Sequence, residues 1–378
     1  MYVLDGHDAG GQFLRRALTL SALENAPVRL ERVRGNRPEP GLANQHLAVL
    51  ELLAAVCDAE VAGDELGAET IEFRPDTADG IDGGTYAVDV GTAGSLTLLI
   101  DALLPLASRL EAPLVVTATG GTDVAWSPPV DYLRRVKLPV LRRHGLQASL
   151  EVERRGFYPA GGGRLQLQLA PSSFAPLSLE TRGEPAGVRV YSTTAAALAD
   201  ADVAGRQATA ALGRLEDRSD GSLRCLERVE TLADTACPGS VIVLALECAP
   251  SEPEHGDSRR LPIAGFSALG EPGKPAERVG EEAADAALAF LDGTAAVDAH
   301  LGDQVLDHLA LAGGRVRLPA LTNHVETSRR LLESFGYDLG VVAEFPETDS
   351  AISSDKGDGD PDEAASSASV VLESRDGE

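Results

Sequence analysis

The first part of the chain alternates between short apolar runs and longer amphipathic stretches, and the order of these segments occurs twice. Apolar residues three and four positions apart predict helices, and short β-rich runs predict strands. Leu47, Leu50, Ala54 and Cys57, for example, form one helical stripe. The first copy predicts strands at Tyr2–Leu4, Val28–Val33, Ala59–Ala62 and Thr70–Phe73 and helices at Gln12–Glu24 and Leu42–Cys57.

The second copy repeats the order β-α-β-α-β-β. A repeated supersecondary unit indicates that each copy forms one sheet with helices packed on one face. We therefore predict an α+β fold built of repeated β-α-β-α-β-β units. The second copy predicts strands at Tyr86–Val90, Pro113–Ala118, Ala148–Glu153 and Arg164–Leu169 and helices at Ala93–Ala107 and Val130–Arg143.

The pattern changes between residues 182 and 279. An alanine-rich helix is predicted at Ala195–Leu215, and strands are predicted at Leu223–Val229 and Ser240–Leu246, before a polar loop. We expect residues 182–279 to form a smaller α/β domain inserted into the repeats.

The β/α pattern returns at Gly280 and continues to Phe345, so residues 1–181 and 280–346 are predicted to form one large domain. Residues 347–378 are acidic and rich in serine, and they show no periodicity. We expect them to be a disordered tail. Removing everything after Pro346 is therefore expected to leave activity intact.

The charge of the chain is strongly negative. The 378 residues carry a formal net charge of −26, and only three of the 33 basic residues are lysines. Such a composition favours solubility in concentrated salt, which screens the repulsion between carboxylates. We therefore predict a halophilic protein. Screening also lets arginine clusters bind phosphate at contact distance, so the charge does not exclude a nucleic acid as partner.

Other bulk features predict a soluble cytoplasmic protein. The N-terminus lacks the basic start and apolar core of a signal peptide, and no apolar run reaches the length of a spanning helix, so no membrane partner is expected. The four cysteines contain no CxxC pair and are expected to be buried thiols. The sequence does not fix the oligomeric state.

Two segments have the composition of phosphate-binding loops. In RVRGNRPEPGLANQHL, Arg34 and Arg37 leave a strand on a proline-stiffened loop that leads to Gln45, and paired guanidinium groups suit a polyphosphate. A surface loop whose arginines form salt bridges is the alternative. In LDGHDAGGQFLRRAL, glycines open a helix between Asp8 and Arg15, which suits phosphate but also fits a plain turn.

Three further glycine-rich segments, GTAGS, ATGGT and YPAGGG, come from the second repeat and its borders, and together they could surround one cleft. In DAHLGDQ, His300, Asp303 and Gln304 lie within one helical turn. His300 and Asp303 could bind a divalent metal. A nucleotide contact or a pair of surface residues is equally compatible with the spacing.

The stretch LTNHVETSRRLLESFG places His324 at the start of a predicted helix, whose apolar face comprises Leu331, Leu332 and Phe335. An imidazole in this position can be a general base, a metal ligand, a nucleophile or a surface residue. These residues alone do not choose among the four roles.

Taken together, the chain resembles the RNA 3′-terminal phosphate cyclase family up to about Phe345. The resemblance rests on seven segments in the order found in that family, namely GGQFLRRALTLS, RGNRPEPGLANQHL, GTAGSLTLLIDALLP, GGTDVAWSPPVDYL, RGFYPAGGG, HLGDQ and HVETS. It implies a fold of repeated units, also found in enolpyruvate transferases, with a smaller inserted domain. That expectation agrees with the repeats seen in the sequence.

The resemblance also implies a reaction. Family members use the histidine of a His-x-x-Thr-Asn pattern as a nucleophile toward the α-phosphate of ATP, and here the pattern falls on His324 to Ser328. The AMP then passes to the 3′-phosphate of RNA, and the 2′-hydroxyl closes a 2′,3′-cyclic phosphodiester with release of AMP. The implied substrates are thus ATP and RNA with a 3′-phosphate end, and the implied metal is Mg²⁺ or Mn²⁺.

The family motifs assign roles residue by residue. They place Asp8 near the metal and the triphosphate, and Pro129 near the adenine or ribose. The other residues implied for the ATP site are Arg15, Arg34, Arg37, Gln45, Asp101, His300, Leu301, Gly302, Asp303 and Gln304.

Four residues depart from the family pattern. Asp8 stands where a glutamate is usual, and Asp101 replaces a glutamine expected near adenine. His300 stands in place of a tyrosine, and Ser328 in place of an asparagine. Because a carboxylate accepts but cannot donate a hydrogen bond, Asp101 could change the choice of nucleotide.

Two other functions remain as alternatives. A branch of the family lacks the nucleophile and serves in ribosome assembly, so a non-catalytic RNA-binding protein is the main alternative. His324 and the arginine loop argue against it, whereas Asp8 and Asp101 leave it open. An enolpyruvyl transferase would need a lysine-rich anion site, which three lysines in the whole chain do not favour.

Overall fold

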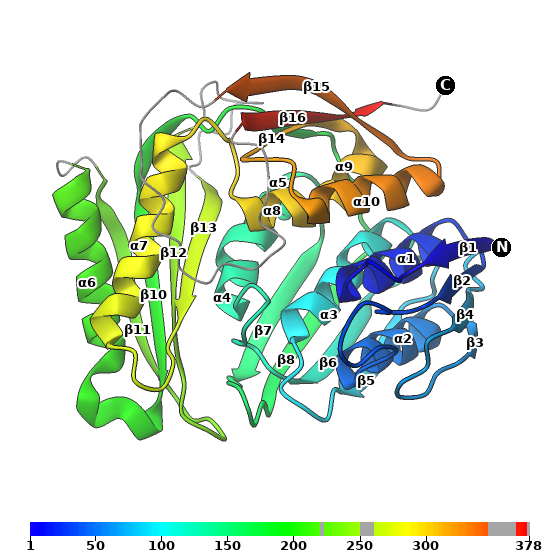
Figure 1. The fold of residues 1–378 in the computed structure, drawn as a ribbon, viewed down its shortest axis with the longest axis horizontal. Coiled ribbons are helices and arrows are strands. Elements are labelled where there is room, and N and C mark those ends of the chain that lie inside the picture. Colours follow the sequence, from blue (N-terminus) through cyan, green and yellow to red (C-terminus); the bar gives the residue numbers. More distant parts are fainter. Residues whose placement is uncertain (220–222, 250–260, 347–367, 376–378) are drawn as a thin grey trace.

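The computed structural model describes residues 1–219, 223–249, 261–346 and 368–375. These residues form four sheets of four strands each. Three of the sheets belong to units that repeat one topology, and the fourth belongs to a unit inserted into the third repeat. Figure 1 shows the inserted unit at the left, the first repeat at the lower right and the third repeat along the top.

The first repeat follows the predicted order of elements closely. Its first two strands are parallel, its last two are antiparallel, and the sheet order is β1-β2-β4-β3. Two helices cover one face of this sheet. The elements are β1 (Tyr2–Asp5), α1 (Gly11–Leu23), β2 (Val28–Glu31), α2 (Asn44–Val56), β3 (Glu60–Ala62) and β4 (Ile71–Arg74).

The second repeat has the same topology, with sheet order β5-β6-β8-β7. The helix predicted at Ala93–Ala107 is shorter, because Ser95 caps its start and a 3₁₀ turn containing Pro105 follows its end. The elements are β5 (Gly84–Asp89), α3 (Leu96–Leu103), β6 (Leu114–Gly120), α4 (Val130–Tyr132), α5 (Leu138–Arg143), β7 (Ala148–Arg154) and β8 (Gly163–Leu169).

The helix predicted at Val130–Arg143 is interrupted by a π-helical turn at Leu133–Lys137. Pro139 lies in the first turn of α5 and has no N–H, so it cannot donate to the carbonyl of Arg135. The wider turn accommodates this missing hydrogen bond.

The third repeat corrects the prediction of a disordered tail. Residues 368–375 form β16, which pairs antiparallel with both β14 and β15 inside the sheet order β9-β14-β16-β15. The buried run Val370, Val371 and Leu372 supplies the inner strand of this sheet. Because β16 completes this sheet, we now expect its removal to destabilise the third repeat. Residues 347–367 and 376–378 lie outside the described part of the chain.

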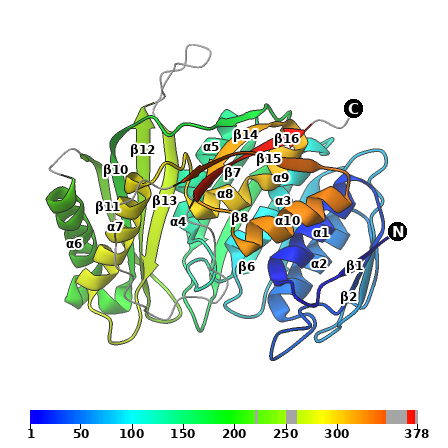
Figure 2. The ribbon, with the colours of Figure 1, turned by 45° about the horizontal axis from the view of Figure 1, so that its top comes forward.

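The remaining elements of the third repeat include the helices that face the first repeat, as Figure 2 shows. In sequence order they are β9 (Leu177–Leu179), α8 (Ala299–Gln304), α9 (Leu306–Ala312), β14 (Gly314–Leu318), α10 (Asn323–Ser334), β15 (Asp338–Pro346) and β16 (Ala368–Arg375).

The inserted unit has a sheet of order β11-β10-β12-β13 covered by two helices. The predicted helix at Ala195–Leu215 starts too early, because a 3₁₀ turn and the left-handed residue Asp202 precede α6. The elements are β10 (Glu184–Ala195), α6 (Val203–Arg218), β11 (Cys225–Ala233), β12 (Ser240–Ala249), β13 (Leu261–Leu269) and α7 (Ala276–Asp292).

The predicted boundary after residue 279 falls inside α7 and is corrected to follow that helix. Val279, Ala283 and Ala287 of α7 are buried in the same apolar cluster as Val190 and Leu244 of the inserted sheet. An amphipathic helix stays with the sheet that buries its apolar face.

The inserted sheet is buried on both faces. One face packs on α6 and α7, whereas Tyr191, Val243 and Ala245 on the other face join the main core of the repeats. At Gly265 an added Cβ would lie 2.6 Å from the Tyr132 ring, so this glycine lets α4 approach β13 closely. The inserted unit is therefore held against the second repeat rather than hanging free. None of the described helices has the length and apolarity that crossing a bilayer requires.

We predict that Leu372→Ala in β16 lowers the free energy of unfolding by about 3 kcal/mol, because the side chain is fully buried and its removal leaves a cavity. Ser374→Ala, in the same strand and half-buried, is the matched control and is expected to change stability by less than about 1 kcal/mol. Urea unfolding in molar salt measures both. Equal stability of the two variants would contradict the placement of β16.

Candidate active site

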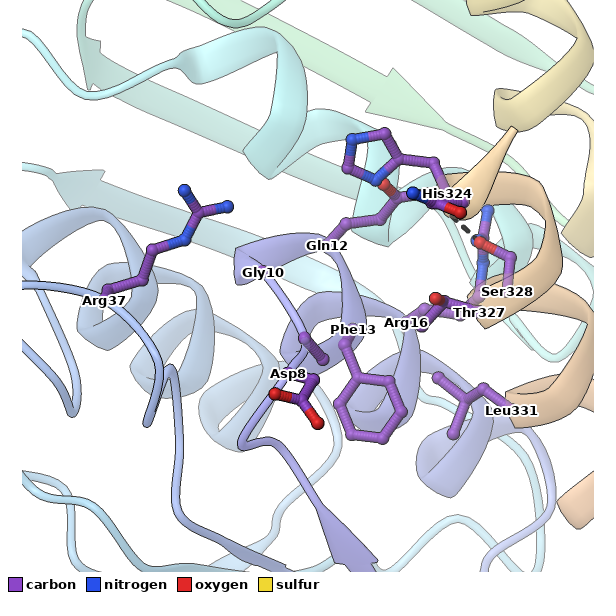
Figure 3. Close-up of a pocket in the computed structure, with 12 residues that line it drawn as sticks. Asp8, Gly10, Gln12, Phe13, Arg16, Arg37, His324, Thr327, Ser328 and Leu331 are labelled. Atoms are coloured by element: carbon purple, nitrogen blue, oxygen red, sulfur yellow. Dashed lines mark hydrogen bonds between the residues drawn. The ribbon is translucent and has the colours of Figure 1, made fainter. Parts of the chain in front are cut away.

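A pocket lies where the loop before α1, the loop after β2 and the start of α10 meet (Figure 3). It joins the first repeat to the third, which are far apart in the sequence. Its lining contains the predicted nucleophile together with two predicted phosphate or metal contacts. The lining residues are Asp8, Ala9, Gly10, Gln12, Phe13, Arg16, Arg37, Asn323, His324, Thr327, Ser328 and Leu331.

His324 is held at the first turn of α10. Thr322 caps the helix, since its hydroxyl accepts a hydrogen bond of 3.2 Å from the Val325 amide. Val325 and Leu332 bury the opposite face of α10, so the His324 side chain is left exposed at the pocket. Figure 3 shows its imidazole above the side chain of Gln12.

The pocket offers an anion both a helix N-terminus and a guanidinium group. Gly10 precedes α1 in an extended conformation, and a Cβ added there would lie 3.7 Å from Nη2 of Arg37. Arg37 makes no ion pair with any residue that the structure describes. Free amides at a helix start and an unpaired guanidinium are the donors that phosphate oxygens accept from.

Two more predicted arginines lie beside this pocket around His46. Burial, followed by the charges of Arg15 and Arg34, lowers the pKa of His46 to about 3, so its imidazole is neutral. Burial and the neighbouring Arg16 lower the pKa of Arg15 to about 10. A Cβ on Gly11 would lie 2.1 Å from Nε2 of His46, so the first residue of α1 must be small.

Arg15, Arg34 and Arg37 thus form a cationic group. Burial, followed by the charge of Arg37, lowers the pKa of Arg34, and Nη1 of Arg34 donates to the Gly41 carbonyl at 2.8 Å. Among the described residues, no carboxylate lies within ion-pair distance of any of the three. In a chain with this excess of carboxylates, three unpaired arginines favour an external anion.

A buried polar network lies under the pocket and was not predicted from the sequence. Nε2 of Gln12 donates to both carboxylate oxygens of Asp303, at 2.7 and 2.6 Å. Nε of Arg16 donates to Asp307 at 2.7 Å, and the same guanidinium also bonds Ser328 and the Asp303 carbonyl. These bonds connect α1 to α8, α9 and α10. One feature of the sequence could have indicated this network: Arg16 is a charged residue on the apolar face of a predicted helix.

The network gives Asp303 a structural role beside the ATP contact that the resemblance implies and the metal contact that its spacing left open. Its carboxylate accepts from Gln12 and Ser328 and lies near Arg16, so it is already satisfied. Within the described ranges, no group of three or more histidine, cysteine or acidic side chains is arranged to hold a metal. Among the described residues, no third histidine, cysteine or acidic side chain is therefore placed to bind a metal together with His300 and Asp303.

Several residues predicted to contact ATP have structural partners. Asp101 forms an ion pair with the fully buried Lys137. Oε1 of Gln45 accepts from the Ser95 amide at 3.0 Å and so joins the first two repeats. His300 is exposed and meets the edge of the Tyr132 ring, with centroids 5.9 Å apart.

Three other predicted contacts are buried. Leu301 belongs to the main core, and Gly302 lets α8 pack on β14, since an added Cβ would lie 2.5 Å from Leu318. The side chain of Leu301 therefore cannot reach a ligand in the pocket. Pro129 is buried at the start of α4, and Gln304 is half-buried at the end of α8.

The three glycine-rich segments do lie together, as predicted, but they pack on one another. Isolated bridges pair Ser95 with Gly121 and Asp123 with Phe157. A Cβ on Gly161 would lie 2.9 Å from the Ala93 Cα, so the chains approach backbone to backbone. None of these residues lines the pocket that contains His324.

Comparison with known proteins agrees with this arrangement. The family model described as RNA 3′-terminal phosphate cyclase matches residues 7–338. A protein of that name from Halobacterium salinarum is 46% identical over 90% of this chain and 96% of its own length. Proteins of the same name from Thermococcus onnurineus and Ectopseudomonas mendocina are 41% and 38% identical, over 91% and 88% of this chain and 95% and 92% of their own lengths.

We predict that Arg16→Met lowers the free energy of unfolding by about 3 to 5 kcal/mol, because it leaves the buried Asp307 carboxylate without its cation. Arg29→Met is the control. Arg29 pairs with Glu31 and Glu72 on the surface, and its loss is expected to cost less than about 1 kcal/mol. Denaturant unfolding distinguishes the two, and similar small losses would show that the network does not hold the helices together.

Proposed function

The chain belongs to the RNA 3′-terminal phosphate cyclase family, and from that premise we propose that it converts the 3′-terminal phosphate of RNA to a 2′,3′-cyclic phosphodiester at the expense of ATP. The observation that carries this proposal is the pocket that unites His324, Asp8 and Arg37 from opposite ends of the chain. A nucleophile, a metal-binding carboxylate and a phosphate-binding guanidinium are what nucleotidyl transfer requires.

In the first step, a ring nitrogen of His324 attacks the α-phosphorus of ATP. A P–N bond forms, the bond to the β-phosphate breaks, and pyrophosphate leaves. The imidazole is exposed at the start of α10, so it can reach a phosphate that sits on the N-terminus of α1. The neutral ring is a nucleophile near pH 7, and covalent transfer divides one difficult condensation into easier steps.

In the second step, an oxygen of the RNA 3′-phosphate attacks the same phosphorus, and the P–N bond to His324 breaks. The RNA end then carries AMP in a pyrophosphate linkage. The neighbouring 2′-hydroxyl finally attacks the 3′-phosphorus and expels AMP, closing the ring. Each transfer moves negative charge onto leaving phosphate oxygens, which fixed guanidinium groups stabilise.

Arg15, Arg34 and Arg37 are the proposed contacts of the triphosphate. Their guanidinium groups lack carboxylate partners among the described residues, and Arg37 lines the pocket at the N-terminus of α1. The charges of Arg15 and Arg34 help to lower the pKa of His46, so its imidazole stays neutral. The other ATP contacts inferred from the family, including Asp101, His300, Gln304 and Pro129, stay proposals.

Asp8 is the proposed protein ligand of a divalent metal. Its side chain is 85% exposed in the pocket, and no second acidic side chain lines the pocket with it. One carboxylate fits Mg²⁺ or Mn²⁺ when substrate phosphates supply the other oxygens, which is how Mg²⁺ is usually bound beside nucleotides. The metal would neutralise charge on the triphosphate.

The runner-up function is a non-catalytic RNA-binding protein of the same family. It would keep the fold without a reactive histidine, whereas His324 here is exposed in a pocket with unpaired cations. Location in the cytoplasm stays a prediction of the sequence.

We predict that incubation with ATP labelled in the α-phosphate, with Mg²⁺ in molar salt, leaves acid-labile label on the protein. His324→Ala is expected to retain none, because the nucleophile is gone. His300→Ala is the control, because it removes a different histidine and keeps His324. We expect this variant to be labelled, but at a higher ATP concentration, since His300 is a proposed ATP contact. The measurement is protein-bound radioactivity after denaturation. Equal label on wild type and His324→Ala, or none on either, would refute the proposed intermediate.

We predict that a chelator abolishes this labelling and that Asp8→Asn raises the metal concentration for half-maximal labelling by about tenfold, because a neutral amide binds a divalent cation more weakly. Asp64→Asn, an exposed acid in the turn after β3, is the control. Titration of Mg²⁺ and Mn²⁺ against label uptake gives the comparison. Identical titrations of both variants and wild type would remove Asp8 from the metal site.

A further inference from the structure

A second concave surface lies between the second repeat and the inserted unit, on segments that the proposed adenylyl transfer does not use. We call it the arginine groove. One wall carries Arg154, the last residue of β7, and Arg155, which follows it. The π-helical turn after α4 adds Arg134 and Arg135. Tyr191 of β10 and Thr231 of β11 form the other wall, and the groove includes Arg134, Arg135, Arg154, Arg155, Tyr191 and Thr231.

The groove exists because the inserted sheet is only partly covered by the repeats. The middle strands of that sheet are buried against α4, as Val243 and Ala245 show. On the edge strand β11, alternate side chains point to one face of the sheet. Those on this face line the open groove, namely Val229, Thr231 and Ala233.

Two of its arginines have no carboxylate partner. Arg135 lies over the Tyr191 ring, 4.6 Å from the centroid, and makes no hydrogen bond or ion pair within the described residues. Arg154 is exposed and bonds only the Gly162 carbonyl among the residues described. Arg154 therefore keeps donors free for a ligand, and Arg135 lines the groove without a carboxylate within ion-pair distance among the described residues.

The acidic side chains of the groove do not cancel these charges. Asp131 is bonded by Arg155 and lies 3.8 Å from Arg134, and Glu153 pairs with Arg164 at 2.6 Å. Asp234 is the remaining carboxylate of the lining. In a protein of net charge −26, a groove lined by arginines without acid partners favours an anionic partner.

Two exposed aromatic side chains extend the surface. Trp126 is 86% exposed and Tyr158 is 74% exposed. They belong to two loops joined by the bridge between Asp123 and Phe157, and the pair Arg155–Asp123 ties the same loops to the groove. Large exposed rings on loops tied to an arginine-lined groove are the elements of a stacking surface for unpaired bases.

We propose that the arginine groove, with Trp126 and Tyr158, binds the single-stranded RNA that precedes the reacting 3′-phosphate. Arg135 and Arg154 contact phosphodiester groups, and the two rings stack on bases. This inference rests on the proposed function, because a strand whose end reacts at His324 must continue across the surface. Helices α4 and α8 connect the two regions. Asp131 of α4 lines the groove, and the next residue, Tyr132, contacts His300 of α8. Asp303 of α8 in turn accepts a hydrogen bond from Gln12 in the pocket of His324.

The test is equilibrium binding of a fluorescent RNA of about ten nucleotides with a 3′-phosphate, which is within the usual footprint of single-strand sites. The full-length protein is used without ATP, and anisotropy is measured over a range of salt concentrations. The variants are Arg154→Gln, the double change of Arg135 and Arg154 to Gln, and Trp126→Ala. Arg278→Gln, on the exposed face of α7, is the control.

We expect the double variant to bind RNA at least about tenfold more weakly than the control, as loss of charged hydrogen bonds requires. The slope of log affinity against log salt should fall by about 0.7 for each phosphate contact removed. Trp126→Ala should also weaken binding about tenfold. Since Arg154 is exposed, Arg154→Gln is expected to fold normally and to show the smaller slope by itself.

An unchanged affinity and salt slope in Arg154→Gln and in the double variant would overturn the groove as an RNA site, and unchanged binding by Trp126→Ala would overturn the stacking. Label uptake from ATP on the same variants should equal that of wild type, because the groove is separate from the pocket of His324. If wild type takes up no label, the proposed function fails. The RNA-binding measurements still show, independently of that result, whether the groove is an RNA site.

Discussion

The buried guanidinium group of Arg16 is the interaction on which the site depends. It lies in α1 of the first repeat and bonds Asp307, Ser328 and the Asp303 carbonyl, all in the third repeat. A buried arginine is tolerated only when its donors are satisfied, so the helices that carry these partners cannot separate without a large penalty. His324 enters the pocket four residues before Ser328, and its position follows from this bond.

The third repeat can offer these partners because its sheet is complete. All three repeats share one strand order, in which the fourth strand lies between the second and the third. In the third repeat that strand is β16, which comes from the far end of the chain. The inserted unit separates β9 from α8 in sequence, yet it packs its sheet against α4 and leaves the topology of the repeat unchanged.

The excess of carboxylates makes the unpaired arginines informative. Most surface arginines of this chain pair with an acid, as Arg29, Arg164 and Arg206 do. Such pairs contribute little to stability but neutralise charge. Two concave surfaces contain arginines without such a partner among the described residues: the pocket of His324 with Arg37, and the groove with Arg135 and Arg154. Both places fit partners that carry phosphate, one as a nucleotide and one as a polymer.

The sequence by itself determined the repeat and most element positions, because periodicity and motif spacing are local properties. It misjudged β16, whose few apolar residues become a strand only between β14 and β15. The ATP contacts that the family motifs imply for Leu301 and Gly302 stay predictions, and the fold buries both residues. Which side chains meet across the repeats, such as Arg16 with Asp307, was decided only by tertiary packing, since burial creates partners that no local pattern specifies.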